Sequence, residues 1–512
     1  LMYALVLIII VILFAWLYTR WREVRNYWAK RGVPHDPPHP ILGSLTFLQR
    51  ENPTLWMRRM YSKFKSPYVG IWLFHRPGLI VNCPELARMI LVKDADNFRN
   101  RFLSSGQTDP VGSLNLFTVN DPVWMYIRRK LSAVFTGAKL RAVQAIIIKK
   151  SEDLMERIRV ETEKEELIDL RVAFTDYTTD VTGEAAFGVS SEATRTGDSA
   201  MRKVTREFMT YNLYRGLCWS SIFFFPKLVD IFGFSFFPKD TTEYLKHLFR
   251  KIVQQRGGYE KDMKECKDLL DALIKLRQDA VKDGEEINED ILLAQAAIFL
   301  FGGFDTTGST LTWVTYEMAH HPQYQDKLYE ELLEAKNKSE SKEFDSYMLA
   351  ELPYLNAVIK ETLRKFPSMG WLDRIARHNY VIDSRLTISA GTVIYVNGTS
   401  MQMDPAYFPD PETFDPERFM PGYDNVKPYT YMPFGEGPRS CIGQRFAYQT
   451  MRFVLASLFL EYKLSPLPHS PQPSEVHVEK NGLFYIADEK LSVLFSNNMF
   501  FEVNHELYEN LV

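Results

Sequence analysis

The segment Phe434-Gly-Glu-Gly-Pro-Arg-Ser-Cys-Ile-Gly443 is the most informative stretch of this chain. Its glycines allow a backbone loop to approach a flat ligand closely, and Arg439 can pair with an anionic group on that ligand. Cys441 stands just before a helical run that begins near Gln444, and the amides and dipole at a helix N-terminus favour a thiolate. The segment therefore predicts a site in which the Cys441 thiolate ligates a metal, with a buried structural cysteine as the alternative.

Two further patterns lie upstream at helical spacing. Glu361 and Arg364 are three residues apart, so they share one side of a helix and can pair, and Glu361 stands 80 residues before Cys441. Trp124 and Arg128 are one helical turn apart. Taken alone, the first pattern is typical of a solvated ion pair and the second of a surface cation–π pair.

A single long helix is predicted for residues 288–320. Asn288 is a suitable N-cap and Pro322 stops the helix, which would be about 48 Å long. Its middle holds Gly302-Gly-Phe-Asp-Thr-Thr307, where each glycine costs about 1 kcal/mol relative to alanine. The glycines indicate either close packing against another helix or a functional groove. Packing alone explains Asp305 poorly, because an acid in an apolar stretch needs a partner or a purpose.

The complete pattern FxxGxRxCxG in residues 434–443 resembles the cytochrome P-450 superfamily of haem-thiolate monooxygenases. The resemblance implies that Cys441 is the axial ligand of a haem b iron, whose thiolate favours O–O cleavage. The residues that it implies for haem binding besides Cys441 are Phe434, Arg439, Gly443, Trp124, Arg128, Arg374 and Arg101. The last two would be further propionate partners, with Arg374 the better match to the family's spacing.

The resemblance extends to the upstream patterns. Together with Arg418 in the sequence Pro416-Glu-Arg-Phe419, Glu361 and Arg364 would form a buried Glu-Arg-Arg network that supports the haem loop and takes no part in the chemistry. In the long helix, Thr306 would hydrogen-bond dioxygen or the water that protonates it, and Asp305 would relay protons from the cytosolic side. Substrate contacts are implied at Phe117, Phe301, Phe304, Trp371 and Leu483, although each could belong to the core instead.

The implied function is a monooxygenase that inserts one oxygen atom of O2 into an apolar small molecule, either a xenobiotic or an endogenous lipid or hormone. Because the chain has no convincing flavin or nicotinamide motif, NADPH-derived electrons would come from a membrane-bound NADPH–cytochrome P-450 reductase docking on the Cys441 side, with cytochrome b5 as a further candidate. Segments 27–34 and 407–411 most resemble the insect microsomal branch associated with xenobiotic metabolism. Two alternatives remain: a haem-thiolate isomerase or dehydratase that does not use O2, and a non-catalytic haem carrier or sensor.

The predicted fold class is mainly α with small β-sheets, because helical patterns dominate from Asp121 onward and short β segments occur near 69–72 and 79–81. The resemblance implies that this is the cytochrome P-450 fold. Leu1 to Tyr18 carry no charged side chain and would span about 27 Å as a helix. Basic residues follow this run, which predicts a single N-terminal transmembrane helix with the bulk of the chain on the cytosolic face of the endoplasmic reticulum membrane. A cleaved signal peptide is the alternative. We expect a transmembrane anchor at 1–19, a basic and proline-rich linker at 20–40, and a haem-binding monooxygenase domain at 41–512.

The composition argues against several classes of partner and site. The formal net charge of −3 gives no basic field for a nucleic acid, so none is expected. Four scattered cysteines argue against a disulfide scaffold or a zinc site. The phenylalanine-rich stretch 222–238 could contact a membrane or fill the core, and the two interpretations carry equal weight. The polar tract 334–346 is expected to be an exposed loop between helices.

Overall fold

The computed structural model describes residues 2–132, 135–261, 266–422 and 425–498. Its helices are α1 (Met2–Arg25), α2 (Pro53–Phe64), α3 (Pro84–Arg88), α4 (Pro110–Ser113), α5 (Val123–Ser132), α6 (Gly137–Glu163), α7 (Leu170–Phe187), α8 (Ala193–Thr196), α9 (Ala200–Phe208), α10 (Leu213–Phe224), α11 (Val229–Phe232), α12 (Lys239–Gln255), α13 (Leu269–Lys282), α14 (Glu289–Ala319), α15 (Pro322–Lys338), α16 (Ser346–Glu351), α17 (Pro353–Lys365), α18 (Gly398–Gln402) and α19 (Gln444–Glu461). Its strands are β1 (Tyr68–Leu73), β2 (Arg76–Val81), β3 (Leu372–Ile375), β4 (Tyr380–Val381), β5 (Thr387–Ile388), β6 (Val393–Val396), β7 (Tyr462–Pro466) and β8 (Val493–Asn497). The fold is mainly helical with small sheets, as predicted.

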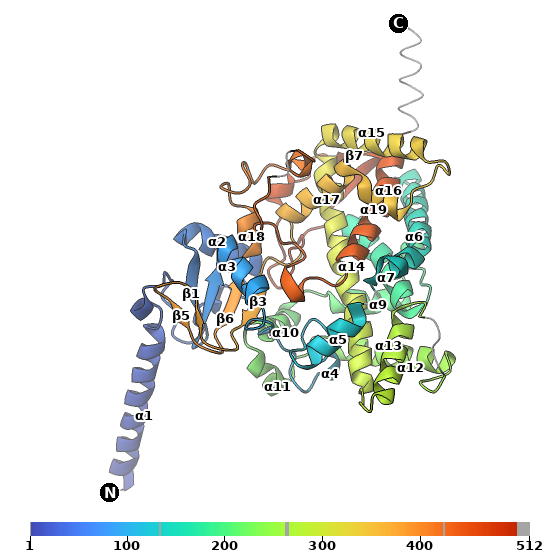
Figure 1. The fold of residues 1–512 in the computed structure, drawn as a ribbon. Coiled ribbons are helices and arrows are strands. Elements are labelled where there is room, and N and C mark those ends of the chain that lie inside the picture. The colour runs from blue at the N-terminus through green and yellow to red at the C-terminus, as the bar shows by residue number, and fades with distance from the viewer. Residues whose placement is uncertain (1, 133–134, 262–265, 423–424, 499–512) are drawn as a thin grey trace.

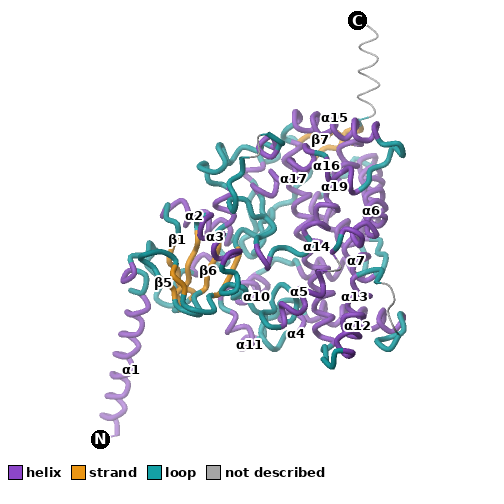
Figure 2. The backbone as a smooth tube through the Cα atoms, viewed as in Figure 1, coloured by secondary structure: helices purple, strands orange, loops and turns teal. Residues whose placement is uncertain are grey.

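The main sheet has the strand order β1-β2-β6-β3 and lies beside the helical body (Figure 1). β1 and β2 form an antiparallel hairpin in which Tyr68 pairs with Val81, and β6 joins β2 in parallel through Gly78 and Val393. Every residue of β1 is buried, which explains its continuous apolar sequence. Figure 2 shows most of the strands gathered in this one lobe, from which α1 projects.

α14 runs through the middle of the helical body and is flanked by α7 (Figure 1). The Asn288 side chain accepts a hydrogen bond from the Asp290 amide at 2.9 Å, which is the predicted N-cap. The helix ends at Ala319, one residue before the predicted end. Among the described residues, α14 is the one helix long and apolar enough to cross a membrane by composition, and 67% of its most apolar window is buried inside the molecule.

The N-terminal helix α1 extends away from the sheet lobe with its described apolar side chains exposed (Figure 1). It continues past residue 19 to Arg25, so the basic residues that follow the apolar run belong to the same helix. Judged by length, hydropathy and charge together, the described part of α1 is not a candidate membrane span, whereas α14 is one. Trp28 is fully buried against Gly70, and the Gly70 amide donates to Pro34 at 2.8 Å. Residues 28–34 therefore pack on the sheet lobe.

The phenylalanine-rich stretch divides between the two interpretations. Phe223, Phe224, Phe236 and Phe237 are buried in the core, whereas Phe232 on α11 is 63% exposed. The polar tract 334–346 is a loop only in part, because α15 continues through its first five residues to Lys338.

Candidate active site

A cavity of about 320 Å³ lies between α14, α5 and the loop that precedes α19. Most of its lining is apolar, with several aromatic rings. The sequence-predicted residues that line it are Arg101, Phe117, Trp124, Arg128, Phe301, Asp305, Thr306, Phe434, Arg439, Cys441 and Gly443. Segments up to 342 positions apart along the chain thus meet at one site.

The cysteine loop needs its glycines. Gly435 and Gly437 adopt φ values of 72° and 73°, which are strained for any other residue. A Cβ on Gly437 would lie 1.8 Å from the Leu91 carbonyl oxygen. The loop can therefore pack against Leu91 only because residue 437 is glycine. The Cys441 amide donates to the Phe434 carbonyl at 2.8 Å and closes the loop.

Cys441 is accessible from the cavity, whereas the thiol of Cys218 is buried elsewhere. Burial by surrounding protein raises the pKa of the Cys441 thiol, while the Gly443 amide and the charges of Arg128 and Arg101 act in the opposite direction. A metal bound to the sulfur would displace the proton. The surroundings of Cys441 therefore suit a metal ligand.

Arg439 and Arg128 frame the same side of the cavity. Arg439 donates to the carbonyl oxygens of Arg99 at 2.8 Å and Val119 at 2.9 Å, and its guanidinium lies 4.1 Å from the centroid of the Trp124 ring. Arg128 donates to the Ser440 carbonyl at 2.9 Å. The cation that stacks on Trp124 is thus Arg439, and not Arg128 as the helical spacing suggested.

Arg101 and Arg374 lie close to Arg439 and add positive charge. Arg101 lines the cavity, stacks at 4.4 Å on the Phe117 ring, and has an Nε with no hydrogen-bond partner. Arg374 is buried behind the lining and donates to the Asp373 carbonyl at 2.7 Å. Burial and the neighbouring arginines lower the pKa of Arg439 to about 8 and that of Arg374 to about 9. In the described parts of the chain, no carboxylate lies within ion-pair distance of Arg101, Arg128, Arg374 or Arg439.

Across the cavity, α14 presents Asp305 and Thr306. The Thr306 hydroxyl donates to the Gly302 carbonyl at 2.7 Å, and Asp305 accepts from Arg171 on α7 at 2.7 Å. The second carboxylate oxygen of Asp305 is buried without a partner. Burial is the largest single effect on Arg171 and lowers its pKa, but the hydrogen bond and charge of Asp305, together with Tyr211 and Asp169, outweigh burial and raise the net pKa. No sequence signal pointed to Arg171, because the pair spans 134 positions.

The paired glycines of α14 have different surroundings. A Cβ on Gly303 would lie 2.6 Å from the Thr182 methyl of α7, whereas nothing lies within 4 Å of one on Gly302, which faces the cavity. Gly303 also lines the cavity, so close packing and a groove both apply to it, whereas only the groove applies to Gly302.

Glu361, Arg364 and Arg418 meet outside the cavity. Arg364 holds both carboxylate oxygens of Glu361, at 2.7 and 2.8 Å, and both side chains are fully buried. Arg418 lies 3.4 Å from Glu361. Burial raises the pKa of Glu361, and Arg364 opposes that rise. The network joins α17 to the turn at Pro416–Phe419.

Three of the five residues expected to contact substrate do not line the cavity. Phe304 and Trp371 are buried in the core, and Leu483 is buried beside Phe484, which does line the cavity. Lining residues that the sequence did not indicate include Phe208, Met209, Trp219, Phe236 and Gln295. Their positions depend on contacts between distant helices, so local patterns carry no signal for them.

A sequence model of the cytochrome P450 family matches residues 33–495. The chain belongs to the cytochrome P450 family. It is 31% identical over 502 residues to cytochrome P450 6k1 of Blattella germanica, covering 94% of each chain. It is also 31% identical to cytochrome P450 6a2 of Drosophila melanogaster, covering 92% of this chain and 96% of the relative, and 33% identical to probable cytochrome P450 6g2 of the same organism, covering 87% and 90%.

The chain is thus a cytochrome P450 monooxygenase, a haem-binding oxidoreductase whose curated relatives include insect family 6 members. Family membership implies a haem, and the side chains of the site fit one. A haem carries an iron that can take a thiolate and two propionates that need cations. Cys441 offers the sulfur, and the four arginines, two buried and two half-buried, lack a carboxylate partner among the described residues. The unpartnered Nε of Arg101 is a donor still to be satisfied.

Proposed function

We propose that this cytochrome P450 inserts one oxygen atom of O2 into an apolar small molecule, using NADPH-derived electrons delivered by a reductase. The observation that carries the proposal is that two features line one cavity. Cys441 with three arginines forms the first, and Asp305 with Thr306 of α14 forms the second. A haem carrier or sensor has no need for the second feature.

Cys441 would be the axial ligand, and the haem, once bound, supplies the redox chemistry that activates dioxygen. Arg439, Arg128 and Arg101 would hold the propionates, because they line the cavity and lack anionic partners in the described chain. Arg374 would add to the same field from behind the lining. Trp124 would keep Arg439 in place by stacking at 4.1 Å.

Thr306 and Asp305 would manage protons. The Thr306 hydroxyl donates its proton to Gly302, so its oxygen keeps lone pairs with which to accept a hydrogen bond inside the cavity. Asp305 has one oxygen held by Arg171 and one without a partner. That arrangement supports Asp305 as a group that can accept a proton on its free oxygen while Arg171 keeps the carboxylate oriented.

The substrate would be apolar and bound by aromatic contacts. Phe117, Phe301, Trp219, Phe236 and Phe484 line the cavity. Gln295 lines it too, but its amide is already bonded to backbone groups of Leu114, Leu116 and Ile291. Few polar groups are therefore free to bind a polar substrate, which supports xenobiotics or lipid-like molecules as substrates.

The protein would sit on the endoplasmic reticulum membrane, with α1 as its anchor and the catalytic domain in the cytosol. The exposed apolar side chains of α1 support this placement, as does the exposed apolar pair Ile231 and Phe232 on α11. An NADPH–cytochrome P-450 reductase on the same membrane, docking on the Cys441 side, would supply electrons, with cytochrome b5 as a second donor.

The test is turnover of a panel of apolar compounds by the haem-loaded chain with reductase, NADPH and isotopically labelled dioxygen. We expect one labelled oxygen atom per product molecule and no product without NADPH. Turnover that proceeds without NADPH would indicate an isomerase or dehydratase instead. Binding of haem with no turnover and no binding of apolar compounds would indicate a carrier or sensor.

A further inference from the structure

One face of α7 packs against the part of α14 that carries Asp305. Thr175, Thr178 and Thr182 follow one another at helical spacing along this face. A Cβ on Gly303 would lie 2.6 Å from the Thr182 methyl, and a Cβ on Gly308 would lie 2.8 Å from the Thr175 methyl. The two helices are therefore close enough for side chains of α7 to reach the backbone of α14.

Thr178 makes such a contact. Its hydroxyl lies 2.7 Å from the carbonyl oxygen of Phe304 on α14. The two acceptors within its own helix, the carbonyls of Phe174 and Thr175, lie farther away at 2.9 and 3.4 Å. A hydroxyl has only one proton to donate. The acceptor nearest to the Thr178 hydroxyl is the Phe304 carbonyl on the neighbouring helix. Thr178 is fully buried, so bulk water cannot replace its hydrogen bond to the Phe304 carbonyl.

The carbonyl of Phe304 shares a planar peptide group with the amide nitrogen of Asp305. A hydrogen bond that fixes this carbonyl therefore fixes the backbone from which Asp305 projects. The side chain of the same residue is held by Arg171, two helical turns before Thr178 on α7. Asp305 is thus held twice by α7, at its backbone and at its carboxylate. These two contacts matter because Gly302 and Gly303 weaken α14 just before Asp305.

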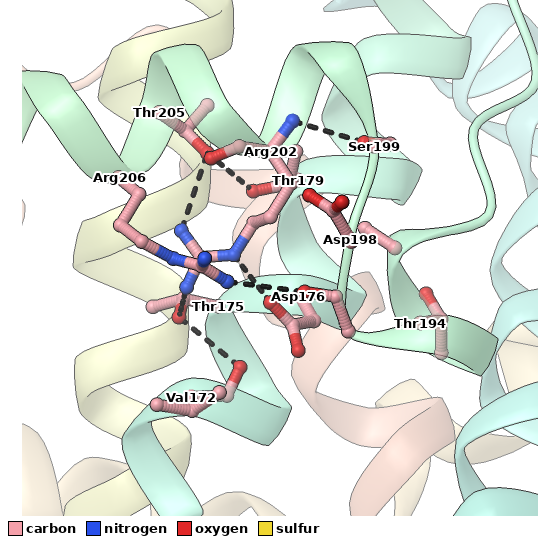
Figure 3. A network of polar contacts seen from close by, with 12 residues as sticks. Val172, Thr175, Asp176, Thr179, Thr194, Asp198, Ser199, Arg202, Thr205 and Arg206 are labelled. Carbon is pink, nitrogen blue, oxygen red and sulfur yellow. Dashed lines mark hydrogen bonds and ion pairs between the residues drawn. The ribbon is translucent and has the colours of Figure 1, made fainter.

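α7 is itself held in place by the buried network that Figure 3 shows. Arg202 on α9 donates to the Thr175 hydroxyl at 2.7 Å and pairs with Asp176. Arg157 on α6 donates to the other oxygen of Asp176 at 2.7 Å. These bonds cross from α6 and α9 to α7, so they fix the position of Thr178 along α14.

We propose that Thr178 is a positioning residue for oxygen activation, acting through the Phe304 carbonyl on the orientation of Asp305 and Thr306. The proposal deepens the proposed function and rests on it. Thr182 provides a matched control, because it is also buried on the same face. Within the part of the chain that the structure describes, its hydroxyl bonds only to carbonyls of its own helix, those of Thr178 at 2.6 Å and Thr179 at 3.4 Å.

The experiment compares Thr178→Val with Thr182→Val in the haem-loaded full-length chain. Both substitutions replace a hydroxyl with a methyl of similar size. We expect Thr178→Val to speed amide hydrogen exchange in residues 304–308 by about tenfold, the factor expected from the loss of one ordinary hydrogen bond. The same variant should divert NADPH electrons from product to hydrogen peroxide, while haem content stays at the wild-type level. Thr182→Val should resemble wild type in both readouts.

Thr178→Ser should restore both readouts, because it keeps the hydroxyl. If Thr178→Val loses haem, Thr178→Ala and Thr178→Ser offer the same comparison, since both lack the methyl and differ only in the hydroxyl. Equal exchange and equal product yield in the Thr178 and Thr182 valine variants would overturn the proposal. A wild-type chain that makes no oxygenated product would instead refute the proposed function, and the exchange comparison would still test the contact.

Discussion

Arginine side chains crowd one side of the cavity at a density that folding alone does not favour. Burial lowers the pKa of all three of Arg101, Arg374 and Arg439. Arg101 further lowers the pKa of the other two, and no carboxylate in the described chain forms an ion pair with any of them. Burying uncompensated charge destabilises a protein. We therefore expect these arginines to destabilise the haem-free chain and an anionic ligand to offset that cost.

Arg101→Met should therefore change the two states in opposite directions. In the haem-free chain it should raise the free energy of unfolding by about 1 kcal/mol or more, because a crowded charge is removed. In the haem-loaded chain it should speed haem loss by about tenfold, because a propionate loses a charge-assisted hydrogen bond. Denaturant unfolding and the rate of haem transfer to a scavenger protein measure the two effects.

Arg99 serves as the control for this comparison. It has Asp96 at 2.5 Å and Asp121 at 3.2 Å as ion-pair partners. Arg99→Met should accordingly lower the stability of the haem-free chain. Our account of the arginine group is wrong if Arg101→Met also destabilises the haem-free chain.

Glu361→Gln should cost about 3–5 kcal/mol of unfolding free energy, because it leaves the buried Arg364 guanidinium without its counter-charge. Glu417→Gln is a nearby control that breaks an exposed ion pair with Lys327 and should cost under about 1 kcal/mol. Denaturant titration of both variants measures the difference. Equal losses would mean that the Glu361 network contributes no more than a surface pair.

Local motifs predicted part of the cavity lining, because the cysteine loop and the helix turn around Trp124 each fix their residues over a short span. They could not predict which cation stacks on Trp124, or that Arg101 lines the cavity while Arg374 lies behind it. Arg171, the partner of Asp305, was missed for the same reason. Each of these contacts is set by the packing of distant elements.

At the scale of the element, α14 illustrates both outcomes. Its two ends were predicted to within one residue, because an N-cap asparagine and a following proline are local signals. The separate roles of its paired glycines could not be predicted, because the sequence does not reveal which face of the helix meets α7.

Alanine substitutions should separate the two glycines. Gly303→Ala should cost about 1–3 kcal/mol of unfolding free energy, because its methyl would collide with Thr182. Gly302→Ala should be neutral or stabilise the helix by up to about 1 kcal/mol. Its methyl would enter the cavity, so it should alter the affinity for apolar ligands instead. Thermal unfolding and ligand titration test this, and a reversed order of stability would contradict the assigned packing.

At the scale of the molecule, the sequence predicted a mainly helical fold with small sheets, because element types follow from periodicity. It did not predict that most of the strands gather in one lobe near α1 (Figure 2). The phenylalanine-rich stretch could not be assigned to core or surface, since its rings divide between the two. Exposed Ile231 and Phe232 leave a second apolar surface besides α1.

Membrane attachment should therefore have two components. Deleting residues 1–19 should turn an integral protein into one that alkaline carbonate extracts but that still floats with lipid vesicles. Adding Ile231→Glu and Phe232→Glu should reduce the remaining vesicle binding by about tenfold or more, because two apolar side chains that would contact the lipid are lost. Tyr347→Glu, at an exposed apolar position away from α11, should leave it unchanged. Unaltered binding after the double substitution would exclude α11 as a contact surface.

The most direct test of the central claim is the absorbance difference spectrum of the reduced protein with and without carbon monoxide. We expect a strongly red-shifted Soret band that is lost in Cys441→Ala and kept in Cys83→Ala, because only Cys441 lines the cavity. Absence of that band from folded, haem-replete protein, or its persistence in Cys441→Ala, would contradict the assignment of Cys441 as the thiolate ligand.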